Sequence, residues 1–409
     1  MTNNNNKSQA NNITKVVLTC DLGASQIKAI AQVYPDGIPC VLAMSPEIAD
    51  VPKGSLERLS HEQLQSNTTW VGIEDEYYIL GALASVFGGT AGLRDLKYQY
   101  APPKITGLLW LACRKFNLDG IEACIQILLP PGEVNDGKQL GQQLIQILRK
   151  GILTPTGRLK AKVLSFDVSG EGSGIMAYHR RSIDESYFQK NIGMLMLGYR
   201  NASFALSQKG NPAKGESTEL GMSWMVNSFV ERTAVGLSKD DSRLVTALLA
   251  AGGGNFNALR SLSRKTTDEG IKSDLALFQK VLPVVREEYC RALLRWVRNI
   301  AALDEVVICG GTADFVRTEL TQHFEKESIP IVWNGNVTIP ERLDTLNLGT
   351  RVTDVWTSHI SHIKMLDKNL GYDRQGRPLL DPNKSMAKNP KATEEEWIRM
   401  GYTPMRKGI

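Results

Sequence analysis

Apolar positions along the chain follow two alternating patterns. Short, nearly continuous apolar runs are typical of buried strands, and apolar residues three and four apart indicate helices with one buried face. Strands are predicted at residues 14–20, 121–130, 158–168, 192–199, 305–311 and 329–333. Helices are predicted at residues 103–117, 136–151, 217–237, 270–302 and 338–356, with one more directly behind the strand at 305–311. This alternation predicts an α/β fold.

Two of the strands lead into hairpins. The first strand ends in a turn at 21–26, and the chain then continues as strand, turn and strand, with Pro35 and Gly37 in the second turn. The strand at 192–199 enters a glycine-containing turn with another hairpin behind it. A further strand-like stretch is predicted at 70–81, within a mixed segment at 46–100.

The composition is that of an ordinary globular protein. Of the 409 residues, 42% are apolar and 22% are charged, which excludes collagen-like, mucin-like and wholly disordered chains and predicts two or three domains. The net charge of +5 is too small to indicate nucleic-acid binding by itself. The Asn-rich start lacks the apolar segment of a signal peptide, and no run reaches the roughly 18 apolar residues of a membrane span. We therefore expect a cytosolic protein without direct membrane insertion.

Cysteines and histidines do not indicate a metal site in this sequence. None of the six cysteines forms a C-x-x-C pair, and most lie in apolar runs, so we interpret them as small buried residues in a reducing compartment. His359 and His362 are three residues apart, but no carboxylate or cysteine cluster completes a set of ligands.

Three glycine-bearing turns follow apolar strands and are the candidate binding segments. They are Asp21-Leu22-Gly23-Ala24-Ser25-Gln26, Leu197-Gly198-Tyr199-Arg200-Asn201 and Gly310-Gly311-Thr312-Ala313. Backbone N–H groups in a tight turn suit phosphate oxygens, a carboxylate at a strand end can hold hydrated Mg²⁺, and a nearby lysine can reach a phosphate. Asp21 and Lys28 fit the last two roles. The alternative is a plain hairpin in which Gly23 supplies backbone freedom.

The third turn has the order strand, Gly-Gly, helix. Gly310 and Gly311 allow a flat ligand to approach the backbone, and the helix N-terminus adds partial positive charge. The same residues are equally compatible with tight packing of a helix on a strand. A fourth glycine-rich segment, 169–174, carries Glu171.

The order of these segments resembles the actin-like ATPase fold and, more specifically, the bacterial plasmid-segregation actins of the ParM type. The resemblance spans residues 14–360. It is carried by 21–28, Ile127-Leu128-Leu129-Pro130, Gly170-Glu171-Gly172-Ser173-Gly174, Gly198-Tyr199-Arg200, Gly221 and Leu346-Asn347-Leu348-Gly349. It implies two pseudo-duplicated domains with a central nucleotide cleft. The first domain is expected at 14–188, with a subdomain inserted at about 46–100, and the second at 189–363.

The resemblance also implies a set of site residues. ATP or GTP is expected between the domains, with Mg²⁺ held by Asp21. Two loops are expected to clamp the phosphates, through Asp21, Gly23, Ala24, Ser25, Gln26 and Lys28 and through Gly198, Tyr199, Arg200 and Asn201. The adenosine is expected on Gly310, Gly311, Thr312 and Ala313. Asp21 and Glu171 are the candidate catalytic carboxylates.

The second loop departs from the family pattern. Met196 stands where an Asp is usual, and Asn201-Ala202-Ser203 replaces Thr-Thr-Asp. These changes remove two carboxylates, which weakens the case for fast hydrolysis but leaves nucleotide binding possible through backbone N–H groups. Glu171 is the best remaining candidate for orienting the attacking water, the alternative being a solvated loop residue. Arg200 is expected to pair with a phosphate or with a neighbouring carboxylate.

The resemblance implies a filament-forming, nucleotide-dependent polymer in the bacterial cytoplasm, serving as a cytoskeleton or in plasmid segregation. Its partners are expected to be further copies of itself and a small adaptor that binds DNA. Two alternatives share the fold: an assembly scaffold with slow or no hydrolysis, and a small-molecule kinase, for which Asp167 is the one candidate base. A chaperone of the same superfamily needs a substrate-binding β-domain, for which residues 364–409 are too few.

The two ends of the sequence are polar. Residues 1–13 and 364–409 are expected to be extended or disordered, with one possible short helix at 392–401. Such tails commonly limit aggregation. The alternative is that Trp397 and Tyr402 anchor a partner protein.

Overall fold

The structure is a computed structural model that describes residues 13–57, 59, 67–91, 96–239, 241 and 243–372. Of the predicted disordered segment at 1–13, residues 1–12 lie outside the described residues, and Ile13 already belongs to the first strand. The predicted tail from 373 onward, with its helix at 392–401 and the candidate anchors Trp397 and Tyr402, also lies outside them.

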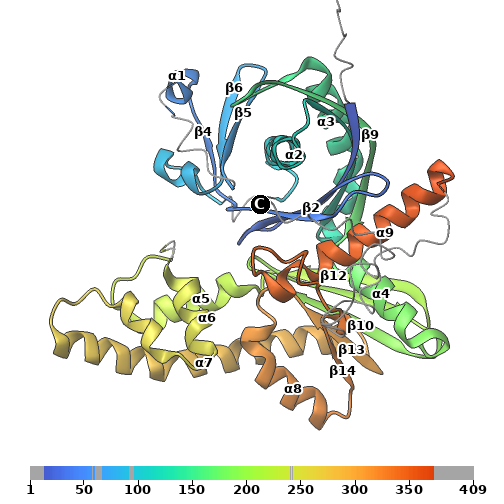
Figure 1. Cartoon of the computed structure of the whole chain (residues 1–409). Coiled ribbons are helices and arrows are strands. Elements are labelled where there is room, and N and C mark those ends of the chain that lie inside the picture. The colour runs from blue at the N-terminus through green and yellow to red at the C-terminus, as the bar shows by residue number, and fades with distance from the viewer. Residues whose placement is uncertain are drawn as a thin grey trace, which may run out of the picture.

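The first half of the chain forms a nine-stranded mixed sheet with the order β3-β2-β1-β7-β9-β8-β5-β6-β4. Its strands are β1 (Ile13–Leu22), β2 (Ile27–Val33), β3 (Cys40–Met44), β4 (Ile48–Asp50), β5 (Thr69–Ile73), β6 (Glu76–Leu80), β7 (Gly120–Leu129), β8 (Ile152–Thr154) and β9 (Gly157–Gly170). Strand β1 is antiparallel to β2 and parallel to β7. Figure 1 shows that this sheet curls around one helix, α2 (Ala101–Phe116).

Helix α2 fills the curl because it is apolar on nearly every side. Residues Ala101 to Cys113 are buried almost without exception. The helix begins with two prolines in its first turn, where the missing N–H groups are not needed, and ends at Asn117 with a φ of 53°. The other helices of this half are α1 (Lys53–Leu56), η2 (Ala82–Phe87), η3 (Pro131–Asp136) and α3 (Gly137–Lys150).

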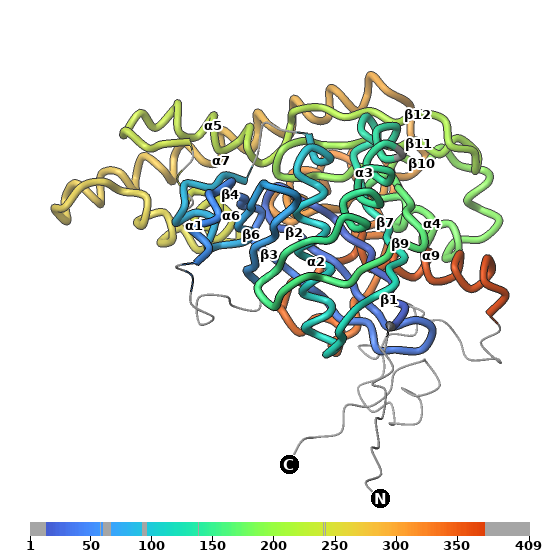
Figure 2. Tube along the Cα trace, turned by 90° about the horizontal axis from the view of Figure 1, so that it is seen from above, coloured from blue at the N-terminus to red at the C-terminus, as the bar shows by residue number. Residues whose placement is uncertain are grey.

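The second half forms a five-stranded sheet with the order β12-β11-β10-β13-β14. Its strands are β10 (Asn191–Leu197), β11 (Ala202–Gln208), β12 (Asn211–Thr218), β13 (Glu305–Cys309) and β14 (Ile331–Trp333). The helices of this half are α5 (Met222–Thr233), α6 (Arg243–Gly252), η5 (Phe256–Leu262), α7 (Asp268–Ile300), η6 (Asp314–Val316), α8 (Arg317–Lys326) and η7 (Asn334–Asn336). Helices α5, α6 and α7 project to one side of the molecule in both views (Figures 1 and 2).

Two helices each follow the sheet of one half in sequence but pack on the sheet of the other half. Helix α4 (Ser173–Ile183), with η4 (Asp184–Gln189) behind it, follows the first sheet but packs on the second, because its Ile175 joins a buried cluster with β10 and β13. Helix α9 (Thr353–Leu370), preceded by η8 (Gly349–Val352), follows the second sheet but packs on the first. The two helices also contact each other. At their crossing a Cβ on Gly174 would lie 2.5 Å from the backbone nitrogen of Ser358.

Side chains of strand β1 point alternately towards α2 on one face of the sheet and towards α9 on the other. Val16 and Leu18 face the cluster around α2, whereas Val17 faces the cluster with Ile363 of α9. Thr19 points to the same side as Val17 and contacts two buried histidines of α9.

The two histidines share one hydroxyl group. Thr19 Oγ1 lies 3.1 Å from His359 Nδ1 and 3.2 Å from His362 Nδ1, and His359 Nε2 lies 2.9 Å from Gln32 Oε1. Because Gln32 Oε1 is an acceptor, His359 carries its proton on Nε2. His359 Nδ1 then accepts the hydrogen bond of the Thr19 hydroxyl, and His362 Nδ1 donates to the Thr19 oxygen. Burial lowers the pKa of His359 to about 3 and that of His362 to about 4, so both rings are neutral at physiological pH.

Most predicted elements are present, two predictions are wrong, and one strand-like stretch divides into two strands. The helix predicted at 338–356 begins only at Thr353, because Asn347 (φ 53°) and Gly349 (φ 55°) are left-handed and the Asp344 carboxylate accepts the N–H groups of residues 348 and 349. The extended tail predicted from 364 is helical as far as Leu370. The stretch at 70–81 is a hairpin of two strands, β5 and β6.

Two simple findings bear on the remaining expectations. Five of the cysteines are buried and Cys40 is partly buried, in agreement with their interpretation as small core residues. Within the described residues, no helix combines the length and the apolar character needed to cross a bilayer.

The helix crossing gives a first testable prediction. Gly174→Ala places a methyl group against the backbone of α9, so we expect the free energy of unfolding to fall by about 1–3 kcal/mol. Thermal or urea unfolding measures it. The matched control is Gly54→Ala, where no atom lies within 4 Å of the added Cβ, and which should be neutral. Equal stability of the two variants would contradict the tight crossing.

Candidate functional site

The first two predicted loops have the same local construction. Each connects two antiparallel strands, β1 to β2 and β10 to β11. A Cβ on Gly23 would lie 2.7 Å from the carbonyl oxygen of Gln26, and one on Gly198 would lie 2.9 Å from that of Asn201. Both turns therefore need a glycine at this position, three residues before an amide side chain.

The two loops differ at their bases. Asp21 pairs across the hairpin with Lys28, and the equivalent pair in the second loop is Met196 with Ser203. Met196 packs against the apolar cluster under α4, and Ser203 Oγ lies 3.1 Å from Ser217 Oγ. One loop thus carries an ion pair where its duplicate carries a thioether and a buried hydroxyl.

The third predicted segment supports the second loop. Gly310 has a φ of 103°, and a Cβ there would lie 2.4 Å from the carbonyl oxygen of Leu197. Thr312 donates its hydroxyl to the carbonyl oxygen of Gly198 at 2.9 Å, and its N–H to that of Leu197 at 3.0 Å. Gly311 has no atom within 4 Å of a Cβ position. Thr312 therefore holds the loop in place, and open space lies over Gly311.

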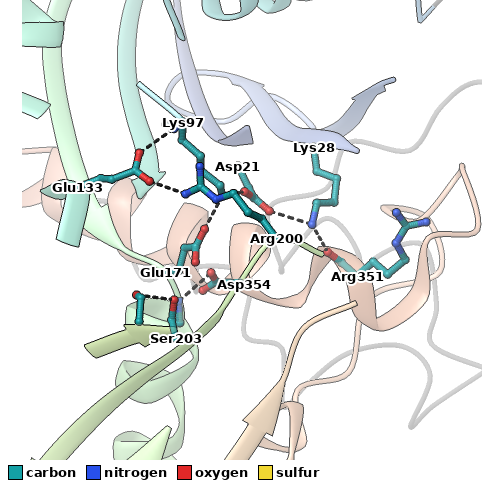
Figure 3. A network of polar contacts seen from close by, with 11 residues as sticks. Asp21, Lys28, Lys97, Glu133, Glu171, Arg200, Ser203, Arg351 and Asp354 are labelled. Carbon is teal, nitrogen blue, oxygen red and sulfur yellow. Dashed lines mark hydrogen bonds and ion pairs between the residues drawn. The ribbon is translucent and has the colours of Figure 1, made fainter. Parts of the chain in front are cut away.

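A network of charged side chains lies between the loops (Figure 3). Asp21 Oδ2 is 2.8 Å from the ammonium nitrogen of Lys28, and Asp21 Oδ1 is 2.6 Å from that of Lys97. The Lys97 ammonium also contacts Glu171, which is 8% exposed. Lys28 donates in addition to the carbonyl oxygen of Arg351, 3.1 Å away. The two predicted catalytic carboxylates are thus joined through one lysine.

The ionisation of this cluster is strongly biased towards charged forms. Burial by itself raises the pKa of Asp21, but the ammonium groups of Lys28 and Lys97 outweigh it and hold this pKa well below its usual range. Burial likewise favours neutral Lys97, and the carboxylates of Asp21 and Glu171 reverse the effect and raise the pKa of Lys97. The site therefore contains fixed charges at neutral pH.

Glu133 connects the first half of the molecule to the second loop. One of its carboxylate oxygens accepts the backbone N–H of Lys97 at 2.7 Å, and the other lies 2.5 Å from the guanidinium of Arg200. Arg200 thus pairs with a neighbouring carboxylate, one of the two partners that the sequence suggested. This ion pair bridges η3 and the β10–β11 loop.

Asp354 contributes a further buried carboxyl group from the first turn of α9. Its Oδ2 accepts the N–H of Gly172 at 2.8 Å, and its Oδ1 has no hydrogen-bond partner among the described residues. Burial, together with the charges of Asp21 and Glu171, raises the pKa of Asp354 to about 7. Asp354 is therefore partly protonated near neutral pH.

The structure places most of the predicted residues together. Asp21, Lys28 and Glu171 belong to the charged cluster (Figure 3), and the other predicted residues, Ala24, Ser25, Tyr199 and Ala313 among them, lie on the turns that follow β1, β10 and β13. Asp167, the candidate base of the kinase alternative, instead lies 3.9 Å from His362 Nε2.

Sequence reasoning missed Lys97, Glu133 and Asp354. No motif surrounds Lys97, and Glu133 follows a Pro-Pro pair without any periodic pattern. Asp354 was placed at the end of a predicted helix, whereas it lies at the beginning of one, where an acidic residue is favoured.

Asp21 is not suited to bind the expected Mg²⁺ directly. Each oxygen of its carboxylate already contacts the ammonium group of a lysine. No group of three or more His, Cys, Asp or Glu side chains in the described part of the chain is arranged to hold a metal ion. A nucleotide fits better, since the tight glycine turns offer backbone N–H groups and the backbone at Gly311 has open space beside it.

Comparison with known proteins establishes the fold. No family model and no curated protein matches the chain. Among solved structures, a 15-stranded ParM filament from Clostridium botulinum is 16% identical, with 86% of this chain and 100% of that chain covered and a TM-score of 0.53. Bacillus thuringiensis ParM with ATP is 12% identical, with 86% and 99% covered and a TM-score of 0.56. An archaeal actin homologue is 13% identical, with the same coverage and a TM-score of 0.55. The chain has the actin-like α/β fold that its sequence resembles.

Asp354 gives a prediction on pH dependence. The pKa of this carboxyl group is about 7 in the folded chain, and its ordinary value is 3.8. Between about pH 4 and 7 the group is therefore ionised in the unfolded chain but still protonated in the folded chain. The free energy of unfolding falls as pH rises through this range. Asp354→Asn removes this loss. We expect the variant to match wild type at pH 4 and to exceed it in stability at pH 8. The gain in the free energy of unfolding is at most about 1.4 kcal/mol for each unit by which the pKa of Asp354 differs between the folded and the unfolded chain. Urea unfolding across this pH range measures the difference.

The control for this experiment is Asp75→Asn in the exposed β5–β6 turn, which should leave the pH profile unchanged. An Asp354→Asn variant less stable than wild type at pH 8 would show that the ionised carboxylate is stabilising.

Proposed function

We propose that this actin-like chain is the subunit of a nucleotide-controlled filament. The observation that carries the proposal is the meeting of three glycine loops from both halves around one charged cluster, in a fold shared with a ParM filament and with ParM bound to ATP. A bacterial cytoplasmic polymer, with a cytoskeletal or DNA-segregating task and a small DNA-binding adaptor, is the specific form that we favour.

The residues of the cleft have distinct roles in this proposal. Backbone N–H groups of the loop at 23–26 and of the loop at 199–201 receive the phosphates of ATP or GTP, with Lys28 as a positive charge beside them. Gly310 and Gly311 allow the base and ribose to approach the backbone. Glu171 accepts a hydrogen bond from the attacking water, with Asp21 beside it.

Nucleotide state controls assembly through the relative position of the two halves. The Glu133–Arg200 ion pair already crosses between them, and phosphates compete with Glu133 for Arg200. A ligand shifts such an equilibrium only by contacting one state better than the other, and a triphosphate reaches both loops. The closed state then presents the surface for a head-to-tail contact that repeats into a helical filament.

A scaffold with slow hydrolysis is the second candidate, and one observation favours it. The position equivalent to Asp21 in the second loop is Met196, so this loop supplies no carboxylate to organise the attacking water.

The test is light scattering of the purified protein with ATP, GTP, ADP or no nucleotide, with phosphate release followed in the same sample. We expect scattering to rise only with a triphosphate and phosphate to appear slowly. In Glu171→Gln we expect phosphate release to fall by about 10²-fold or more while scattering persists longer, because the water loses its hydrogen-bond acceptor. Glu122→Gln, in an exposed ion pair with Lys162, is the control.

Each result has a defined meaning. Scattering without phosphate release by wild type supports the scaffold. The absence of scattering under every condition would refute autonomous assembly.

A further inference from the structure

Lys97 occupies a central position in the charged cluster. Its ammonium nitrogen contacts Asp21 Oδ1 at 2.6 Å and Glu171 Oε1, and its own backbone N–H is held by Glu133 at 2.7 Å. The side chain is only 11% exposed. The lysine is thus fixed at both ends, by its backbone and by its charge.

Two carboxylates that lie close together in a buried site repel each other unless a cation lies between them. In phosphate-binding sites that cation is commonly a divalent metal ion held by one or two carboxylates and the phosphates. Here the ammonium of Lys97 has this position, and Lys28 neutralises the other oxygen of Asp21. The charges of the two lysines and two carboxylates cancel, so the cluster has no net negative charge to attract a metal ion.

We propose that Lys97 takes the place of the divalent cation in this site, so that the nucleotide phosphates meet an ammonium group between Asp21 and Glu171. This inference rests on the proposed nucleotide binding. An ammonium group has three N–H donors, and the two carboxylates use two of them. The third is available to a phosphate oxygen without loss of either carboxylate contact. Nucleotide binding is therefore only weakly dependent on magnesium.

The first experiment uses the metal alone and needs no nucleotide. Lys97→Ala leaves Asp21 and Glu171 facing each other without a bridging cation, and the shorter side chain leaves room for an ion. We expect the thermal unfolding temperature of this variant to be lower than that of wild type in EDTA and to rise when millimolar MgCl₂ or MnCl₂ is added. Wild type should show no such rise. The control is Lys162→Ala, which removes a lysine from an exposed ion pair and should behave as wild type.

The second experiment measures the affinity for a fluorescent ADP analogue in EDTA and in MgCl₂. For wild type we expect the two dissociation constants to agree within about threefold, and for Lys97→Ala we expect binding in EDTA to weaken by about tenfold or more, with magnesium restoring most of the loss. A residue that only stabilises the fold would weaken binding equally with and without magnesium.

The outcomes separate this inference from the proposed function. If wild type is itself stabilised by magnesium, or if Lys97→Ala gains nothing from it, Lys97 does not stand in a metal position and the inference is wrong. If wild type binds the analogue only with magnesium, the phosphate role of Lys97 is refuted. If neither protein binds the analogue under any condition, the proposed function fails, and the metal-alone result still decides whether Lys97 fills a cation site.

Discussion

The close crossing of α4 and α9 is the constraint on which the arrangement of this molecule depends. Each helix belongs by sequence to one half and packs on the sheet of the other, so neither half can bury its apolar face alone. The crossing is tight, because any side chain at Gly174 would collide with the backbone of α9.

The charged cluster is a direct consequence of that crossing. Gly172 and Asp354 lie at the first turns of α4 and α9, and the hydrogen bond between them joins the two helix ends. Glu171 immediately precedes α4, and Lys28 reaches the carbonyl oxygen of Arg351 just before α9. Helix N-termini carry partial positive charge, which favours carboxylates and phosphates at this place. The packing of two helices thus determines where the negative charges of the site are gathered.

Local patterns in the sequence predicted the strands, the glycine turns and most helices, because each depends on neighbouring residues. The order of the turns predicted the fold and brought Asp21, Lys28 and Glu171 to one site. The failures came from interactions between distant segments. Lys97 acquires its role only when the turn before α2 meets β1 and Glu171, and α9 continues to Leu370 because its apolar side meets β1 and β7. No periodicity within either segment contains that information, since a helix or a turn is compatible with many partners.

The asymmetry between the two duplicated loops has a further consequence. The first loop carries its charges at the base of the hairpin, in Asp21 and Lys28, and the second has Met196 and Ser203 at the same register positions. The second loop instead carries its charge at the tip, in Arg200, which is held by Glu133 of the first half. Under the proposed function, chemistry and closure belong to different halves: the carboxylates proposed to act on water, Asp21 and Glu171, lie in the first half, and the second half supplies Arg200, for which the phosphates would compete with Glu133. Glu133 also accepts the backbone N–H of Lys97, the lysine that joins Asp21 and Glu171. One carboxylate is thus shared by the contact between the halves and by the proposed reaction site, so that the proposed function couples the two by direct contact, without any longer pathway.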